Sequence, residues 1–431
     1  MRFSRFATVA GAILLAFPPV AAQAKGTTTT TTPPCQSLPK AGGAYLHCSW
    51  GGLSLPGFNF TSTNFTGTDL SNANLASSVM IGTNLTGVNL TGAKLDGVIS
   101  RGIVGTPSSL PSGWKVSRGF LLGPKANLTG DDLRGIDVTG ASLRSANLSG
   151  VITGGIVGTS VALPTGWILA AGYLVGPESI LVGADLSSAD LTNASLHAAN
   201  LSRADLTSAN LTRVNLRDST LTGATIASAT FTGASLAGVT SGSMVGTPSA
   251  LPNLWGVQRG YLIGPGAVLR HAQLSYSSFI GFSLQGANLT GANLNYSNFN
   301  GVNLTSANFN GANLSHTSLV GADLSQASLY KATAQSSNAT QANFSGANLT
   351  EFDFSKSVAS NSVFIHANLT KAIFSGANLT NANLSNTALR GVVLGTAVLK
   401  GLLATGTSGT PASLPAKWVV RGGAIKGPGS R

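Results

Sequence analysis

The sequence predicts an all-β solenoid that carries short loop and hairpin insertions. An apolar residue, usually Leu, recurs at every fifth position through four long runs. The residues between these apolar centres are mainly Asn, Ser, Thr and Gly, which are mediocre or poor helix formers. A second, different repeat interrupts the runs. Repetition of this kind defines the architecture of a chain before any functional site is considered.

A period of five fits neither a helix nor a simple strand. Five residues of an α-helix rotate by about 500°, so leucines at this spacing would form no apolar stripe. A strand alternates its side chains with a period of two. Three extended residues followed by a two-residue corner do fit: Ala287 and Leu289 would point inward, Asn288 outward, and Thr290 and Gly291 would turn the corner. Such units wind into coils that stack about 4.8 Å apart.

The unit Ala-(Asp/Asn)-Leu-(Ser/Thr)-Gly resembles the repeat of the pentapeptide-repeat family, from about Leu55 onward. The resemblance implies a right-handed quadrilateral parallel β-helix with four pentapeptides in each coil. Large residues spaced by four such units, such as Phe279 and Phe299, should then stack in one column. We therefore expect the centres, Leu294 among them, to be buried along a rod of roughly 60 Å, before the insertions are added.

The second repeat, which we call the cassette, occurs at about residues 97–124, 150–177, 238–265 and 401–428. Each copy contains Gly-Thr, Leu-Pro, Trp and Gly-Pro in that order. The Pro-rich half predicts a loop, and the half after the Trp, with a Gly in its middle, predicts a short hairpin. We expect the cassettes to project from one side of the rod as lobes. The fourth should cap the C-terminal coil and hide its sheet edge.

Each cassette contains one tryptophan, and these are Trp114, Trp167, Trp255 and Trp418. The rings either anchor the lobes against the coil or form a row of aromatic platforms for a carbohydrate or another ligand. The residues that follow the Trp differ between copies, whereas a common ligand site would repeat its polar contacts as well. We therefore expect the four rings to be mostly buried and to anchor the lobes.

Residues 1–24 resemble a secretory signal peptide, with Arg2 and Arg5 before an apolar stretch and a cleavage site near Ala24. We expect a protein that is secreted to the cell envelope or the exterior, and no later segment has the length and apolarity of a transmembrane helix. Residues 25–48 are expected to form a Thr- and Pro-rich linker and a loop closed by Cys35 and Cys48, and residues 49–431 the solenoid. In an oxidising compartment the two cysteines are expected to pair; free thiols are the alternative.

The charge distribution suggests a partner without identifying it. The chain has a formal net charge of +12 and contains no acidic residue after Asp353. The basic residues beyond that point are Lys356, Lys371, Arg390, Lys400, Lys417, Arg421, Lys426 and Arg431. A basic end could attract an anionic polymer of a cell envelope, a protein or nucleic acid, and solubility is the plainer explanation.

Few residues suggest chemistry. His271, His316 and His366 are not separated by one full turn of the coil, so they should not stack or form a metal site. Asp185 and Asp205 are separated by one full turn and should be neighbours, either binding a cation or forming a solvated surface pair. We predict no catalytic residue, no cofactor and no metal.

The leading hypothesis is a non-catalytic secreted scaffold, structural or binding, at or outside the cell envelope. One alternative is recognition of a polysaccharide, of ice or of another ordered surface by the Ser and Thr ladders or by the cassette tryptophans. Another is a β-helical polysaccharide-cleaving enzyme, although no carboxylate cluster is present in the sequence pattern. The best-understood members of the pentapeptide-repeat family protect DNA gyrase with an acidic, DNA-like surface. The basic charge and the expected export argue against such a partner here.

Overall fold

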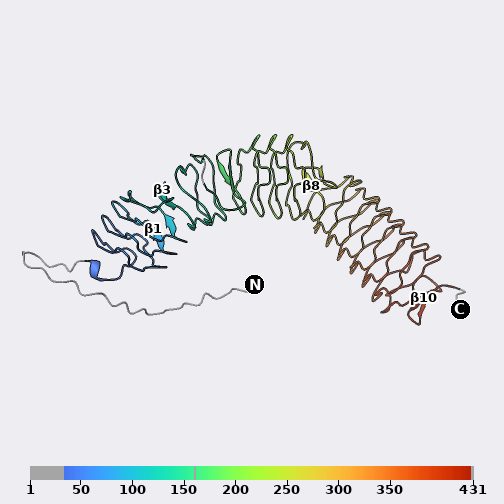
Figure 1. Cartoon of the computed structure of the whole chain (residues 1–431). Coiled ribbons are helices and arrows are strands. Elements are labelled where there is room, and N and C mark those ends of the chain that lie inside the picture. The colour runs from blue at the N-terminus through green and yellow to red at the C-terminus, as the bar shows by residue number, and fades with distance from the viewer. Residues whose placement is uncertain (1–33, 160–161, 429–431) are drawn as a thin grey trace, which may run out of the picture.

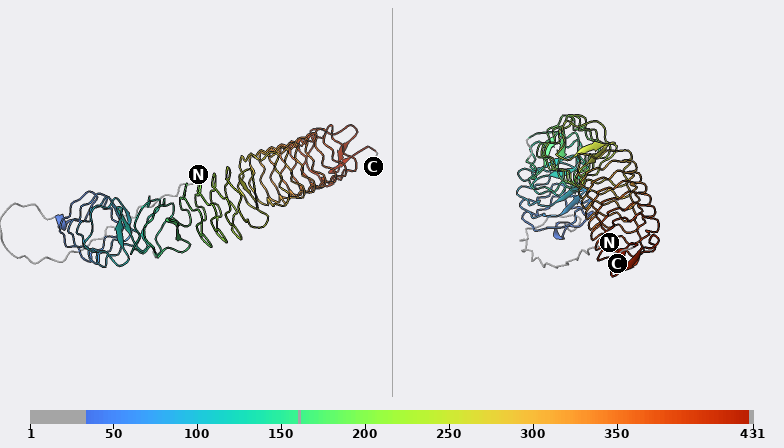
Figure 2. Two further views of the ribbon diagram at one scale, coloured as in Figure 1. Left: turned by 90° about the horizontal axis from the view of Figure 1, so that it is seen from above. Right: turned by 90° about the vertical axis from the view of Figure 1, so that its right-hand side faces the viewer.

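The described part of the chain forms a curved rod of stacked coils (Figure 1). The computed structural model describes residues 34–159 and 162–428. In the regular runs a parallel bridge joins each outward residue to its equivalent four units later, as between Asn288 and Asn308, and successive bridges within a coil are one unit apart. Each regular coil therefore has four sides, one for each pentapeptide, as expected. Figure 2 shows the same stack of coils from above and from one side.

The five-residue unit has the predicted conformation. Ala287 and Leu289 are fully buried, Asn288 is partly exposed, and the Leu289 N–H donates to the carbonyl of the next coil at 2.7 Å. Gly291, the second corner residue, has a φ of 65°. This left-handed conformation explains why Gly, Asn and Ser are frequent at that position. Leu294 is also fully buried, so the inward assignment of the centres is confirmed.

Aromatic centres stack in columns inside the rod. The Phe279 and Phe299 rings lie 4.3 Å apart between centroids with an interplanar angle of 6°. Phe344 and Phe364 repeat this arrangement at 4.8 Å and 3°. With four pentapeptides in each coil, residues at equivalent positions lie directly above one another. A densely packed interior then requires residues of similar size at these positions.

Regular elements are short because most coil contacts are single bridges. The 3-10 helix η1 covers Pro34–Gln36, and the strands β1 (Val79–Ile81) and β2 (Ile99–Arg101) pair in parallel. The other strands form one antiparallel hairpin in each cassette. These hairpins are β3 (Lys115–Ser117) with β4 (Phe120–Leu122), β5 (Ile168–Ala170) with β6 (Tyr173–Val175), β7 (Gly256–Gln258) with β8 (Tyr261–Ile263), and β9 (Val419–Arg421) with β10 (Ala424–Lys426).

Each of the first three cassettes is a coil that has been lengthened by its hairpin. Across the first cassette Ile99 bridges Asn127, whereas a regular coil would bring it to position 119. The excess, 127 − 119 = 8, equals the length of the hairpin from Lys115 to Leu122. The preceding half of the cassette still pairs with the coil before it, for example where Asn84 bridges Val104. The cassette therefore stays within the stack.

The hairpins are buried layers, and the prediction that they project as lobes is wrong. Leu121 and Leu122 of β4 are both fully buried, but they belong to two different sections of the hydrophobic core. Adjacent side chains of a strand point to opposite faces, so β4 has core on both sides. The same division occurs at Leu174 and Val175 in β6 and at Leu262 and Ile263 in β8. Two adjacent apolar residues require burial on both faces, which a projecting lobe could not provide.

The fourth hairpin closes the C-terminal end of the rod. Ile425 of β10 is buried against the last section of the core, whereas the next residue, Lys426, is partly exposed. The Ile425 N–H donates to the carbonyl of Ala404, and the Thr407 N–H donates to that of Gly423. The hairpin thus covers the last coil, in agreement with the predicted cap, and leaves Val419 and Val420 of β9 exposed.

Aromatic residues and a disulfide close the N-terminal end. Parallel bridges begin at Ala44, one unit before the predicted start of the solenoid, with Tyr45 and Trp50 in the place of leucines. Cys48 is buried in the inward position that Ala usually occupies, and it is bonded to Cys35. The indole N–H of Trp50 donates to the carbonyl of Cys35 at 3.1 Å. The sequence analysis missed this first unit because the regular spacing of leucines starts later.

Candidate functional sites

The Ser and Thr ladders on the surface take part in the corners of the coils. The Thr290 hydroxyl donates to Oδ1 of Asn288 at 2.7 Å, and the Thr290 N–H donates to the same oxygen at 3.2 Å. This arrangement recurs along the rod, for example at Asn348 and Thr350. The hydroxyl proton is therefore already used within the unit. This internal use weakens the alternative in which ordered hydroxyls recognise a polysaccharide or ice.

The histidines lie apart from one another. His271 lies against Gly291, where an added Cβ would be 2.5 Å from its Nδ1. His316 stacks on Tyr296 at 4.6 Å, and Tyr296 stacks on Tyr276 at 4.8 Å. Among the described residues, no group of three or more His, Cys, Asp or Glu side chains could hold a metal ion.

The predicted neighbours Asp185 and Asp205 form a parallel bridge. Each carboxylate accepts the hydroxyl of its own corner, from Ser187 at 2.7 Å and from Thr207 at 2.5 Å. The hydrogen bonds from Ser187 lower the pKa of Asp185, so this carboxyl keeps its charge. Asp185 is exposed and Asp205 is partly exposed, as in a solvated surface pair, and nothing in the geometry favours a shared proton.

Each cassette tryptophan lies on the glycine of its own Gly-Pro pair. A Cβ on Gly123 would be 2.0 Å from Cδ2 of Trp114, and the same distance separates the corresponding atoms in the second and third cassettes. In the fourth, a Cβ on Gly427 would be 2.9 Å from Trp418. All four rings are partly buried, and each packs against at least one section of the core: Trp114, Trp167, Trp255 and Trp418. These contacts favour the anchoring role, which remains a prediction.

The C-terminal end combines exposed basic residues with a hollow beside a tryptophan. Lys400, Lys417 and Arg421 are exposed. A hollow of about 350 Å³ is lined by Trp418, by the apolar Leu402 and Ile425, and by Lys400 and Lys426, among others. The basic end predicted from the sequence thus includes one of the four tryptophans.

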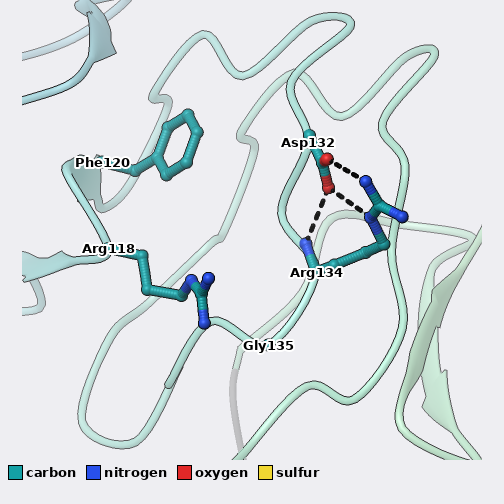
Figure 3. Close-up of a pocket in the computed structure, with 5 residues that line it drawn as sticks. All are labelled: Arg118, Phe120, Asp132, Arg134 and Gly135. Atoms are coloured by element: carbon teal, nitrogen blue, oxygen red, sulfur yellow. Dashed lines mark hydrogen bonds and ion pairs between the residues drawn. The ribbon is translucent and has the colours of Figure 1, made fainter.

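A larger hollow lies beside the first cassette (Figure 3). Its volume is about 550 Å³, and it is lined by Arg118, Phe120, Asp132, Arg134 and Gly135. Arg118 belongs to the turn between β3 and β4, where it and Gly119 have φ values of 47° and 81°. Positive φ at both positions identifies a type I′ turn, whose twist matches that of the strands. The turn directs Arg118 towards the following coil (Figure 3).

The two arginines of this hollow are held differently. Nε and Nη2 of Arg134 donate to the two oxygens of Asp132 at 2.9 and 2.5 Å. These bonds lower the pKa of Asp132 to about 2, with the side-chain hydrogen bond as the largest cause. Nη1 of Arg118 lies 3.2 Å from where a Cβ of Gly135 would be, and Arg118 forms no ion pair with a carboxylate in the described part of the chain. The hollow therefore contains two cations and one anion.

A buried carboxylate lies beside this hollow in sequence. Asp131 occupies the inward position at which Ala is usual, and its side chain is 1% exposed. Nε of Arg101, whose own side chain is half-exposed, forms an ion pair with it. Burial raises the pKa of Asp131, and the charge of Arg101 opposes this shift. Sequence reasoning missed the pair, although an Asp at an inward position of the five-residue unit was a visible exception.

No helix in the described residues is long enough and apolar enough to span a membrane.

A family model for pentapeptide repeats matches the chain in eight copies, at residues 53–99, 125–152, 178–207, 199–238, 267–305, 307–346, 340–376 and 360–395. The matches together cover more than half of the chain, and the gaps between them correspond to the cassettes. With the four-sided coils, this match confirms the predicted right-handed quadrilateral β-helix. No curated protein matches the sequence.

Several solved structures are similar to the chain. HetL, a pentapeptide repeat protein involved in heterocyst differentiation regulation from the cyanobacterium Nostoc, is 24% identical over 70% of this chain and 91% of its own, with a TM-score of 0.18. Rfr23 from the cyanobacterium Cyanothece is 30% identical over 28% and 88%, with a TM-score of 0.15. A pentapeptide repeat protein of the Arabidopsis thaliana thylakoid lumen is 24% identical over 28% and 71%, with a TM-score of 0.15.

Proposed function

Because the chain belongs to the pentapeptide repeat family, whose members are generally non-catalytic structural or interaction proteins, we propose that it is an exported binding scaffold. The rod binds an anionic polymer at or outside the cell envelope, and the contact is made by its C-terminal end. The N-terminal pattern of residues 1–24, which lies outside the described residues, supports export. The Cys35–Cys48 disulfide is also typical of proteins in oxidising compartments.

The observation that carries the proposal is the excess of exposed cations beside Trp418. The sequence has no acid after Asp353, so Lys400, Lys417 and Arg421 have no carboxylate nearby in the chain to neutralise them. Like charges on one end of a rod produce a positive field that attracts a polyanion. The hollow beside Trp418 adds an aromatic and apolar surface at the same place. A polymer that carries both charges and apolar faces, such as an acidic polysaccharide, fits this combination.

The test is binding of the purified protein to immobilised polygalacturonate, with neutral dextran as the comparison polymer. We expect binding to polygalacturonate that weakens as salt rises, because screening reduces attraction between exposed charges. Replacing Lys400, Lys417 and Arg421 together by Gln should weaken binding by roughly tenfold or more.

The matched control removes the same charge from the middle of the rod. Arg203, Arg213 and Arg217 are also exposed, and replacing all three by Gln should leave binding almost unchanged. Equal losses in the two triple variants would mean that net charge alone drives binding, which contradicts a site at the C-terminal end. Export is tested separately, by sequencing the N-terminus of the protein recovered outside the cytoplasm, where cleavage after Ala24 is expected.

A further inference from the structure

The first cassette lacks a hydroxyl group that the second and third cassettes use. The Tyr173 hydroxyl accepts the backbone N–H of Asp185 at 3.1 Å, and the Tyr261 hydroxyl accepts that of Gln273 at 3.4 Å. Both acceptors lie twelve residues before their donors. In the first cassette the corresponding residue is Phe120, which has no hydroxyl, and the corresponding donor is Asp132.

This substitution leaves a donor free at the hollow. The N–H of Asp132 has no hydrogen-bond partner among the described residues. Asp132 and Phe120 both line the hollow of about 550 Å³, and the Phe120 ring is only partly buried. Where the other cassettes place a phenolic oxygen, the first therefore has open space, an unpaired N–H and an aromatic surface.

The charged residues around this space are also specific to the first cassette. The positions of Arg118, Phe120 and Arg134 correspond in the second cassette to Ala171, Tyr173 and Ser187, and in the third to Arg259, Tyr261 and Ser275. Neither of the later cassettes combines two arginines with a Phe. Asp132 orients Arg134 through two hydrogen bonds, whereas Arg118 forms no ion pair with a described carboxylate.

We propose that this hollow binds an acidic sugar, a ring that carries a carboxylate or a phosphate group. The planar fork of Arg118 matches either oxyanion, Nη1 of Arg134 can donate while Nε and Nη2 stay on Asp132, and the Asp132 N–H supplies a further donor. A free oxyanion would occupy only a small part of the volume, whereas the apolar face of a sugar ring can pack on Phe120. The site lies at the first cassette, far along the chain from the C-terminal end. It does not depend on the function proposed for that end.

The chain itself supplies the variants for the test. Phe120→Tyr introduces the hydroxyl of the second and third cassettes, which would extend into the hollow and accept the Asp132 N–H. Arg118→Ala introduces the residue of the second cassette. Both changes are compatible with the fold because this chain already contains them at equivalent positions, and thermal melting verifies this. Arg259→Ala removes the same charge from the third cassette and serves as the matched control.

The measurement is calorimetric titration of the full chain at low ionic strength. The probes are galacturonate and glucose 6-phosphate, with galactose and inorganic phosphate as ligands that lack the charge or the ring. We expect one or both acidic sugars to bind, with affinity reduced by roughly tenfold or more in Phe120→Tyr and in Arg118→Ala, as for loss of a charged hydrogen bond. Arg259→Ala and the C-terminal triple variant should bind like the parent protein.

Three results would overturn the proposal. The first is that neither acidic sugar binds. The second is that Phe120→Tyr binds the sugars with unchanged affinity. The third is that inorganic phosphate binds as tightly as both sugars, which would mean that the sugar ring contributes nothing to affinity. A preference for galacturonate would identify the oxyanion as a carboxylate, and a preference for glucose 6-phosphate would identify it as a phosphate.

Discussion

The paired apolar residues of the cassette strands should stabilise opposite sections of the rod. Leu262 and Ile263 are adjacent in β8, and both are fully buried. Leu262 packs with the section of the core that begins at Val175, and Ile263 packs with the section that ends at Ile425. Replacing each by Ala should therefore destabilise the rod on one side of β8 only.

The expected loss can be estimated from the packing. Truncating a buried Leu or Ile to Ala costs about 2–5 kcal/mol, and the larger values apply where the structure cannot close the cavity. β8 has little freedom to move, because it pairs with β7 and because the Leu262 N–H donates to the Ser241 hydroxyl at 2.9 Å. The upper half of the range is therefore expected. A loss of about 3.5 kcal/mol or more should make local opening more frequent by at least about 300-fold.

Hydrogen exchange followed by mass spectrometry can locate this loss along the chain. In a solenoid each coil contacts mainly its neighbours, so sections can open separately. Leu262→Ala should accelerate exchange in residues 181–240, and Ile263→Ala in residues 267–305. Lys426→Ala changes the residue of the last cassette that corresponds to Ile263 but is partly exposed, and it should have an effect within about 0.5 kcal/mol. If both β8 variants accelerated exchange in the same section, the strand would not divide the core.

Three further predictions concern other parts of the rod. Trp255→Ala should destabilise the protein by about 3–5 kcal/mol if the ring anchors its cassette. Strong acrylamide quenching of Trp fluorescence together with an unaltered melt would contradict the anchoring role. Reducing the Cys35–Cys48 disulfide should cost about 2–3 kcal/mol, and mass spectrometry of the non-reduced protein should show a loss of two hydrogens. Asp132, with its pKa lowered to about 2, should stabilise the fold above about pH 4, and this contribution should be lost as the pH falls towards 2. The raised pKa of Asp131 has the opposite sign, because folding disfavours its ionised form. Thermal melting should be measured between pH 2 and pH 7. The melting temperature of Asp132→Asn should fall less in acid than that of the parent protein, and Asp131→Asn should be more stable than the parent protein at neutral pH.

The regular coils could be predicted from the sequence because the position of each residue in its unit determines its environment. Inward, outward and corner positions repeat with every unit, so Leu294 could be placed in the core without any other information. The turn of four pentapeptides then predicted the stack of Phe279 on Phe299. Local geometry and long-range packing share one period here, and one pattern therefore specifies both.

The cassettes were harder to place because their hairpins follow a different period. The glycine in the turn correctly predicted the hairpin, but we expected the hairpin to project from the rod and to be exposed. The missed signal is the residue pair in the second strand. Leu121 and Leu122 are both apolar in the first cassette, whereas the last cassette has Ile425 followed by Lys426. A polar residue at the second position fits only a strand that has hydrophobic core on one side. The residue at this position therefore distinguishes a hairpin inside the rod from a hairpin that caps its end.

The hollow at the first cassette could not be found by searching for residues that stack. The spacing between Arg118 and Arg134 is not a whole number of pentapeptide units, and the two side chains meet only because the hairpin turn reaches the next coil. Comparing the cassettes with one another would have identified Phe120 as the exception, but not the space that it leaves. The missing hydroxyl creates a binding site only if charged side chains surround the space that it leaves. The positions of those side chains can be read only from the structure.

The division of the core also separates the two proposed binding sites energetically. The hollow lies at β4, where one section of the core ends and the next begins, and the C-terminal end closes the last section. Sites that share no contacts usually behave additively. A change at Phe120 should therefore leave the C-terminal end intact, and loss of the C-terminal charges should leave the hollow intact. Because the coils between them form a continuous hydrogen-bonded stack, one rod can hold both sites at a fixed separation without coupling their affinities.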